Sequence, residues 1–321
     1  MATVRRLVAS FTLGLLGTGG LGLPACAQEE VPFVTTPDRV TLAMLGIAGV
    51  GPADRLIDLG SGDGRIVITA ARRFGARGLG VEIVPDLVKR SRDAAARAGV
   101  ADRTEFREQD LFKTDLSGAT VITMYLLPEV NLQLRPSLLA LAPGTRVVSH
   151  DWDMGDWLPD RSLTLDVPEK AIGREKISRI HLWRVPAPVD GLWCGTEGVA
   201  LLLQQRFQQV QGQARAGGQA RGLSGRLDGA RLELLAADGR LRLRWTGDAS
   251  ASAPRAVPDS GVDGLAATAA TAARAASPGT RLARLRVKHA TGRLGPWLGQ
   301  SLRRAADGAT ACSGEALIHR P

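Results

Sequence analysis

The chain has 321 residues, of which 44% are hydrophobic, and a net charge of +9. This length has room for two domains, and the hydrophobic content is ordinary for a globular protein with a sizeable core. Only 4% of the residues are aromatic, so aliphatic packing must dominate. Neither a Cys-x-x-Cys nor a His-x-x-x-His spacing occurs, which argues against a bound metal ion.

The N-terminus has the pattern of an export signal. Arg5 and Arg6 precede an apolar stretch from Leu7 to Leu23, and a small-residue site, Ala25-Cys26-Ala27, follows it. We therefore expect residues 1–27 to be a signal peptide or membrane anchor, with lipidation of Cys26 as an alternative. The arginines predict a protein that is exported, periplasmic or anchored facing outside, and cytoplasmic only if the signal is not used.

Helical and apolar patterns alternate over the next part of the chain. Thr36-Pro37-Asp38 begins a predicted helix that ends near Gly49. The predicted strands that follow are 55–59, 78–82, 104–108, 121–125 and 145–149, with helices starting near 64, 85 and 126 between them. This order predicts a parallel sheet with helices on both faces, closed by an antiparallel hairpin within 162–185.

The pattern changes beyond a Pro-Ala-Pro linker at 186–188. Residues 188–321 predict a β-rich accessory domain, interrupted by an Ala/Ser/Pro-rich insertion at about 249–280 that we expect to be disordered. From Asp190 onward the chain carries 18 Lys and Arg against 10 Asp and Glu. Removal of the signal leaves Cys194 and Cys312, an even pair that is a disulfide candidate in an exported chain, with two buried thiols as the alternative.

The most informative segment is LIDLGSGDGRIVITAA, from Leu56 to Ala71. It predicts a strand, a glycine turn and a helix, the opening of a nucleotide-binding α/β fold. The third glycine comes one residue too early for a dinucleotide fingerprint, and Asp58 suits an ammonium better than a phosphate. Glu82 ends the next apolar run, where a ribose-binding acid is expected. An amino acid joined to a ribose without phosphate describes S-adenosylmethionine.

Residues 31–157 resemble class I S-adenosylmethionine-dependent methyltransferases. The matching pieces are VPFVTTPDRV, DLGSGDGRIVI, GVEIVPDLVKRSR, FREQDLFKTDLS and LAPGTRVVSHDWDMGDW. They are most similar to the small protein-lysine methyltransferases of the ATP synthase c-subunit and adenine nucleotide translocase type. The resemblance implies an α/β, Rossmann-like methyltransferase domain over 31–187. The segment MYLLPEVN stands where relatives that methylate bases or glutamine have an Asn/Asp-Pro-Pro-aromatic motif. This difference argues against a nucleic-acid base or a glutamine as the substrate.

The resemblance also implies roles for individual residues. Asp58 and the loop Gly60-Ser61-Gly62-Asp63-Gly64 would hold the methionine part of S-adenosyl-L-methionine, with Thr36 closing over it. Glu82, followed by Ile83, would bind the ribose hydroxyls, and Asp110, followed by Leu111, the adenine amino group. Candidates to orient or deprotonate the acceptor follow strands four and five, namely Tyr125, His150 and Asp151.

The acceptor is expected to be a lysine on a protein, with a small molecule as an alternative. Nucleic acid is disfavoured because arginine alternates with leucine, as on a solvated sheet face, without interleaved aromatic residues. A different class of function also stays open, an exported binding or scaffold protein that keeps the fold without transfer activity. Membrane association is expected through the N-terminal segment.

Overall fold

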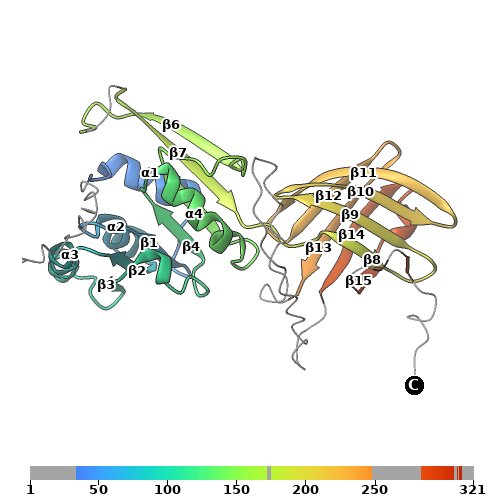
Figure 1. Cartoon of the computed structure of the whole chain (residues 1–321), viewed down its shortest axis with the longest axis horizontal. Helices are drawn as coiled ribbons and strands as arrows, with labels where there is room; N and C mark the ends of the chain where they lie inside the picture. The colour runs from blue at the N-terminus through green and yellow to red at the C-terminus, as the bar shows by residue number, and fades with distance from the viewer. Residues whose placement is uncertain (1–33, 172–174, 248–282, 307–308, 310, 313–321) are drawn as a thin grey trace, which may run out of the picture. The chain divides into compact units, whose positions relative to one another are not determined.

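The structure is a computed structural model that describes residues 34–171, 175–247, 283–306, 309, 311 and 312. Its first part is a seven-stranded sheet with the order β3-β2-β1-β4-β5-β7-β6 (Figure 1). The first five strands run parallel, and β7 is antiparallel to both of its neighbours. The strands are β1 (Arg55–Leu59), β2 (Arg77–Glu82), β3 (Thr104–Glu108), β4 (Val121–Met124), β5 (Arg146–His150), β6 (Arg161–Asp166) and β7 (Ile177–Arg184).

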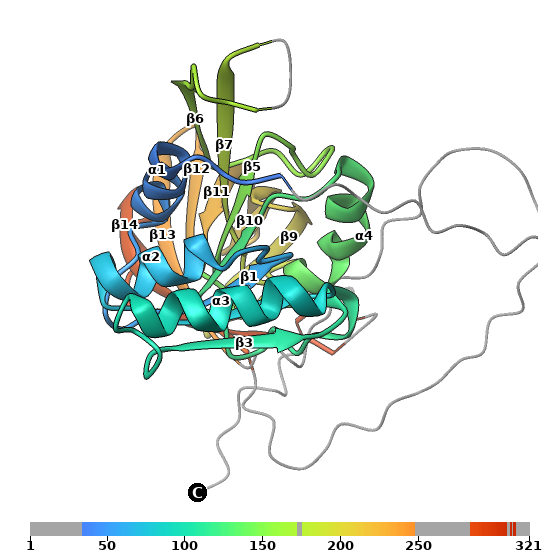
Figure 2. The same ribbon diagram turned by 90° about the vertical axis from the view of Figure 1, so that its left-hand side faces the viewer.

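Helices cover both faces of this sheet. They are α1 (Asp38–Ala48), α2 (Arg65–Phe74), α3 (Pro85–Arg97), α4 (Pro128–Leu139) and the short 3-10 helix η1 (Leu111–Lys113). Figure 2 shows how these helices are arranged around the sheet. Buried side chains of α1, α2 and α3 share one apolar cluster with the sheet, whereas α4 belongs to a second cluster. Adjacent residues of β1 divide accordingly, because Leu56 joins the first cluster and Ile57 the second.

Local sequence explains where these helices begin and end. Pro85 and Pro128 occupy first-turn positions of α3 and α4, where the missing N–H of proline costs no helical hydrogen bond. Gly49 and Gly75 adopt the left-handed conformation directly after α1 and α2 and end them. No helix in the described ranges is both long and apolar enough to span a membrane.

The second part is a closed barrel of eight strands, with the order β10-β11-β12-β13-β14-β15-β8-β9. All of its pairings are antiparallel. The strands are β8 (Gly191–Cys194), β9 (Ala200–Arg206), β10 (Gln209–Ala216), β11 (Gln219–Asp228), β12 (Arg231–Ala236), β13 (Gly239–Thr246), β14 (Arg284–Gly292) and β15 (Ser301–Arg304), with the 3-10 helix η3 (Gly295–Trp297).

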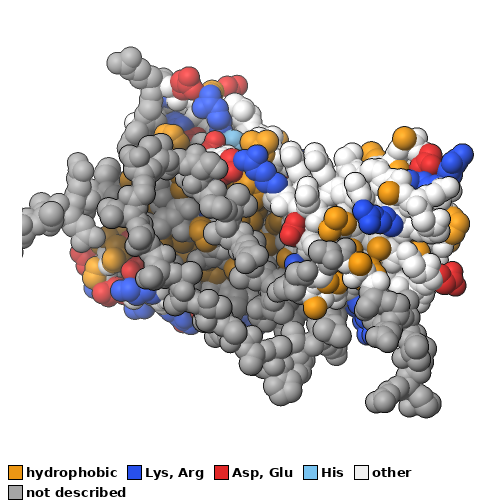
Figure 3. All heavy atoms as spheres, turned by 45° about the vertical axis from the view of Figure 1, so that its right-hand side comes forward, with side chains coloured by type: hydrophobic (Ala, Val, Ile, Leu, Met, Phe, Trp, Pro, Cys, Tyr) orange, Lys and Arg blue, Asp and Glu red, His pale blue; other side chains and the backbone are white. Residues whose placement is uncertain are grey.

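Side chains fill the inside of the barrel. In β13, Leu241, Leu243 and Trp245 point inward and are buried, while the arginines between them are exposed. The inward residues join an apolar cluster that includes Trp193, so the barrel encloses a packed core. Charged and scattered hydrophobic side chains lie on the outer surface shown in Figure 3.

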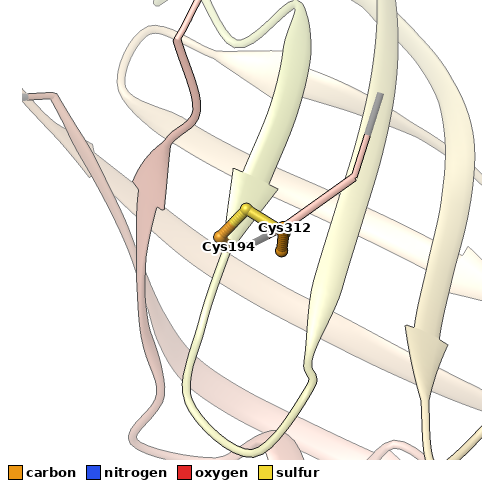
Figure 4. The surroundings of a disulfide bond; sticks show 2 residues. All are labelled: Cys194 and Cys312. Carbon is orange, nitrogen blue, oxygen red and sulfur yellow. A yellow bond between two sulfur atoms is a disulfide. The ribbon is translucent and has the colours of Figure 1, made fainter. Parts of the chain in front are cut away.

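The predicted fold class is confirmed: a Rossmann-like mixed sheet with flanking helices precedes an antiparallel β-rich region. Cys194 and Cys312 form the expected disulfide, with Cα atoms 5.6 Å apart (Figure 4). The predicted signal at 1–27 lies outside the described residues, as does the predicted insertion at 249–280.

Candidate active site

The glycine loop after β1 is shaped by three left-handed residues. Gly60, Gly62 and Gly64 have φ angles of 71°, 54° and 78°, a region that L side chains rarely adopt. The N–H groups of Gly60 and Ser61 both donate to the Val81 carbonyl, at 3.0 and 2.9 Å. These bonds hold the loop against the carboxyl end of β2, so the two strands present their ends together.

Glu82 is bound by three backbone amides. Its Oε2 accepts from Gly62 N–H at 2.9 Å, and its Oε1 accepts from Ile83 and Val84 N–H at 2.9 and 3.1 Å. The carboxylate therefore joins the glycine loop to the turn before α3. Ile83, also predicted in the site, is 66% exposed.

Asp110 and Leu111 follow β3. Asp110 Oδ1 accepts from Phe112 N–H at 2.9 Å, and this bond caps η1, which begins at Leu111. Lys113 Nζ lies 3.6 Å from the Asp110 carboxylate. The predicted adenine-binding residues thus stand at the end of a strand that neighbours β2.

Asp58 is a buried carboxyl group whose negative charge has few stabilising partners. It is 2% exposed, and its Oδ1 accepts a hydrogen bond from Thr123 Oγ1 at 2.7 Å. Burial, together with the negative charges of Glu82 and Asp63, raises the pKa of Asp58 to about 8. Ser61 Oγ nearby is buried without a partner among the described residues. A positively charged group would relieve this site, so it fits the ammonium of a bound amino acid.

Arg65 connects the glycine loop to the segment before α1. Its Nη2 lies 2.6 Å from Asp63 Oδ2, and its Nη1 donates to the Thr36 carbonyl at 2.9 Å. Thr36, which is 5% exposed, also places Oγ1 3.5 Å from His150 Nδ1. Thr36 therefore bridges the predicted cofactor loop and the predicted acceptor residues.

His150 is enclosed at the end of β5. It is fully buried, its Nε2 lies 2.9 Å from Ser178 Oγ, and its Nδ1 faces Thr36. Burial lowers the pKa of His150 to about 4, so the ring is neutral near pH 7. Its ring centre lies 4.0 Å from that of Tyr125. Both ring nitrogens therefore have protein partners, and Nε2 also lies 3.5 Å from Asp151 Oδ2.

Tyr125 and Asp151 meet through their polar ends. Tyr125 Oη donates to Asp151 Oδ2 at 3.4 Å, and burial together with the Asp151 charge raises the pKa of Tyr125 to about 12. Asp151 has a left-handed φ of 63°, which is uncommon for a residue other than glycine. Arg179 fixes it twice: Asp151 N–H donates to the Arg179 carbonyl at 2.6 Å, and Asp151 Oδ1 accepts from Arg179 N–H at 3.0 Å.

Lys170 completes this group and was missed by the sequence analysis. It comes from the β6–β7 connection, and its Nζ lies 2.7 Å from Asp151 Oδ2 and 2.6 Å from the Ile177 carbonyl. Although burial acts to raise the pKa of Asp151, hydrogen bonds from Lys170 and Arg179 hold it below its usual value. No motif marks Lys170, because its partner is brought near only by the hairpin.

The predicted residues therefore gather at the carboxyl ends of the parallel strands. Cofactor candidates lie at or just after the ends of β1, β2 and β3, with Thr36 just before α1, and acceptor candidates lie at or just after the ends of β4 and β5. In an open α/β sheet this edge is where ligands bind. Among the described residues no cluster of His, Cys, Asp or Glu is arranged to hold a metal ion. The fold and the site together define a class I methyltransferase.

Comparison with known proteins identifies the family. The family model of the ANTKMT methyltransferase domain matches residues 58–161. A protein-lysine N-methyltransferase of Saccharolobus islandicus is 42% identical over 139 residues, which are 43% of this chain and 86% of that protein. The chain belongs to this family of S-adenosylmethionine-dependent methyltransferases.

Two further proteins are similar to parts of the chain. The mouse adenine nucleotide translocase lysine N-methyltransferase is 36% identical over 132 residues, 40% of this chain but only 57% of the mouse protein. The crystal structure of an RNA methyltransferase from Salinibacter ruber, solved in complex with S-adenosyl-L-homocysteine, is 54% identical. The match covers 49% of this chain and 98% of the Salinibacter ruber chain, with a TM-score of 0.45.

Proposed function

We propose that this enzyme methylates the ε-amino group of a lysine on a protein. The observation that carries the proposal is the Lys170–Asp151 pair, because it places a primary amine 2.7 Å from a carboxylate at the acceptor end of the site. An incoming lysine has the same chemistry. The names of the archaeal and animal relatives agree with this acceptor.

The cofactor supplies an electrophilic methyl group on a sulfonium. In this proposal Asp58 and the glycine loop bind its amino-acid part, and Asp58 pairs with the ammonium. Glu82 accepts from one ribose hydroxyl through Oε2, because Oε1 already accepts two backbone N–H groups, and Asp110 accepts from the adenine amino group. Ile83 and Leu111 provide apolar contact beside them.

At the acceptor end, the chain has to present a neutral amine in line with the methyl group. Asp151 Oδ2 accepts one N–H of the acceptor nitrogen, and the neutral Tyr125 hydroxyl, itself directed at Asp151, limits its position. The half-buried surroundings favour loss of the ammonium proton to water before attack. His150 contributes by fixing the Tyr125 ring.

The test is transfer from labelled S-adenosylmethionine to host protein extract, read by mass spectrometry of the labelled peptides. We expect methylated lysine with the parent enzyme, a large loss with Asp151→Asn and a smaller loss with Tyr125→Phe. Asp166→Asn, in an exposed part of β6, is the matched control and should keep full activity. Label on nucleic acid or a small molecule, with none on lysine, would overturn the proposal. Cofactor binding without any transfer would favour the scaffold alternative.

We also propose that the enzyme works outside the cytoplasm. The N-terminal order of arginines, apolar run and Ala-Cys-Ala supports export. The Cys194–Cys312 disulfide supports the same location, because such bonds persist mainly in oxidising compartments.

A further inference from the structure

Five basic side chains crowd the outer face of three neighbouring barrel strands. We call them the basic strip: Arg244, Arg284, Arg286, Lys288 and Arg303. All five are exposed, and they lie on β13, β14 and β15, which are hydrogen-bonded in that order (Figure 1). In the part of the chain that the structure describes, no carboxylate forms an ion pair with any of them, unlike Arg240 and Arg242, which share Glu233.

The strand register places like charges directly opposite one another. Arg244 is the partner of Arg286 across β13 and β14, and Arg284 is the partner of Arg303 across β14 and β15. Neighbouring strands are about 5 Å apart, and alternate residues about 7 Å along a strand. Like charges in such positions repel and destabilise the sheet. A partner that presents many negative charges on one face would therefore relieve this repulsion most.

An exposed leucine adjoins the strip. The 3-10 helix η3 leads to Leu298, whose side chain is 61% exposed. The following residues run beside β14, since Gly299 N–H donates to the Val287 carbonyl and Val287 N–H to the Gln300 carbonyl. Leu298 is thus an apolar group at the Lys288 end of the strip.

This combination fits one kind of partner. Among the described residues, the tryptophans of the barrel, Trp193, Trp245 and Trp297, are all buried and cannot stack on bases at its surface. Arginine side chains match phosphate groups well, and an apolar side chain beside them gains from contact with acyl chains. We propose that the basic strip and Leu298 dock the barrel on the surface of a bilayer rich in anionic phospholipid.

The test is co-sedimentation of the full chain with vesicles of phosphatidylcholine alone or with 30% phosphatidylglycerol. The triple variant Arg244→Gln/Arg284→Gln/Arg286→Gln is compared with Arg206→Gln/Arg215→Gln/Arg231→Gln, which removes three exposed arginines from β9, β10 and β12. Every protein keeps the same N-terminal segment, so a difference between variants reports on the barrel. Thermal melting confirms folding, and the strip variant should melt no lower than the parent.

We expect the parent to bind phosphatidylglycerol vesicles more tightly than phosphatidylcholine ones, and the advantage to shrink as salt rises. The affinity of the strip variant for phosphatidylglycerol vesicles should fall about a hundredfold, roughly fivefold per arginine, and that of the control variant much less. Leu298→Ser should lower binding at every salt concentration. Equal binding by the two triple variants, or no preference for phosphatidylglycerol, would overturn the proposal. So would tighter binding to duplex RNA or DNA than to the vesicles.

Discussion

Glu82 Oε2 accepts a hydrogen bond from Gly62 N–H at 2.9 Å, and this bond links the end of β2 to the middle of the glycine loop. The other carboxylate oxygen binds the Ile83 and Val84 amides. Glu82 therefore shapes the loop as well as offering acceptors to a ribose. A change at this residue acts on the cofactor by both routes.

The first prediction concerns Glu82→Gln. The amide keeps one acceptor oxygen but loses the charge and one or two of the three backbone hydrogen bonds, so cofactor binding should weaken by about 1–3 kcal/mol. Calorimetric titration with S-adenosylmethionine measures this, and Asp93→Asn, on the exposed side of α3, is the control. A 2′-deoxyribose analogue should lose less affinity in the variant than in the parent. Equal losses would show that Glu82 does not contact the ribose.

The second prediction concerns the stability of the ligand-free protein. The folded pKa of Asp58, about 8, lies above its ordinary value of 3.8. Its contribution to stability is thus fully present below pH 3.8 and is lost as the pH rises through 8. Asp58→Asn, which keeps an acceptor for Thr123, should melt higher than the parent at pH values above about 8, with the advantage fading toward pH values near 4. A constant difference across this range would contradict the raised pKa.

The third prediction follows from the same carboxyl group. An ammonium beside Asp58 favours its charged form, so cofactor binding at pH 7 should release up to about one proton. Calorimetry in buffers of different ionisation enthalpy measures the number released. Asp58→Ala should abolish binding without unfolding the chain. Unchanged affinity in that variant would remove Asp58 from the site.

The fourth prediction concerns Lys170. Its Nζ occupies the carboxylate oxygen that the acceptor amine needs, while Arg179 holds Asp151 in place independently. Lys170→Met should therefore lower the KM for the acceptor several-fold. Loss of the lysine charge also raises the pKa of Asp151, so the acid limb of the pH–activity profile should shift to higher pH. Lys89→Met, exposed on α3, is the control. A raised KM would mean that Lys170 only supports the site.

Local patterns made part of this site predictable. The glycine spacing and the strand-end positions of Asp58 and Glu82 follow from short segments, and the structure places them at one edge of the sheet. Gly64 shows where a motif misleads, because a Cβ there would lie 2.7–2.9 Å from Phe106 and Ser91. Glycine is therefore needed at position 64 for close packing against Phe106 and Ser91 as well as for the turn.

Other features depend on contacts between distant segments. Closure of the barrel needs β8 to pair with β15, whose residues lie more than 100 positions later in the chain. The enclosure of His150 likewise depends on Thr36 and Ser178, which come from opposite ends of the domain. Alternating strands predict a sheet, but neither the pairing of its edges nor such burial is encoded in a short pattern.

The fifth prediction joins the disulfide to export. Cys194 and Cys312 close a loop of 118 residues, which entropic models value at roughly 4–5 kcal/mol, so reduction or Cys312→Ser should lower the melting temperature of the barrel. In its native host the protein should begin near Gln28 and carry this bond. Mass spectrometry of unreduced peptides from that protein measures both features. An intact Met1 together with free thiols at both cysteines would place the enzyme in the cytoplasm and contradict the export proposal.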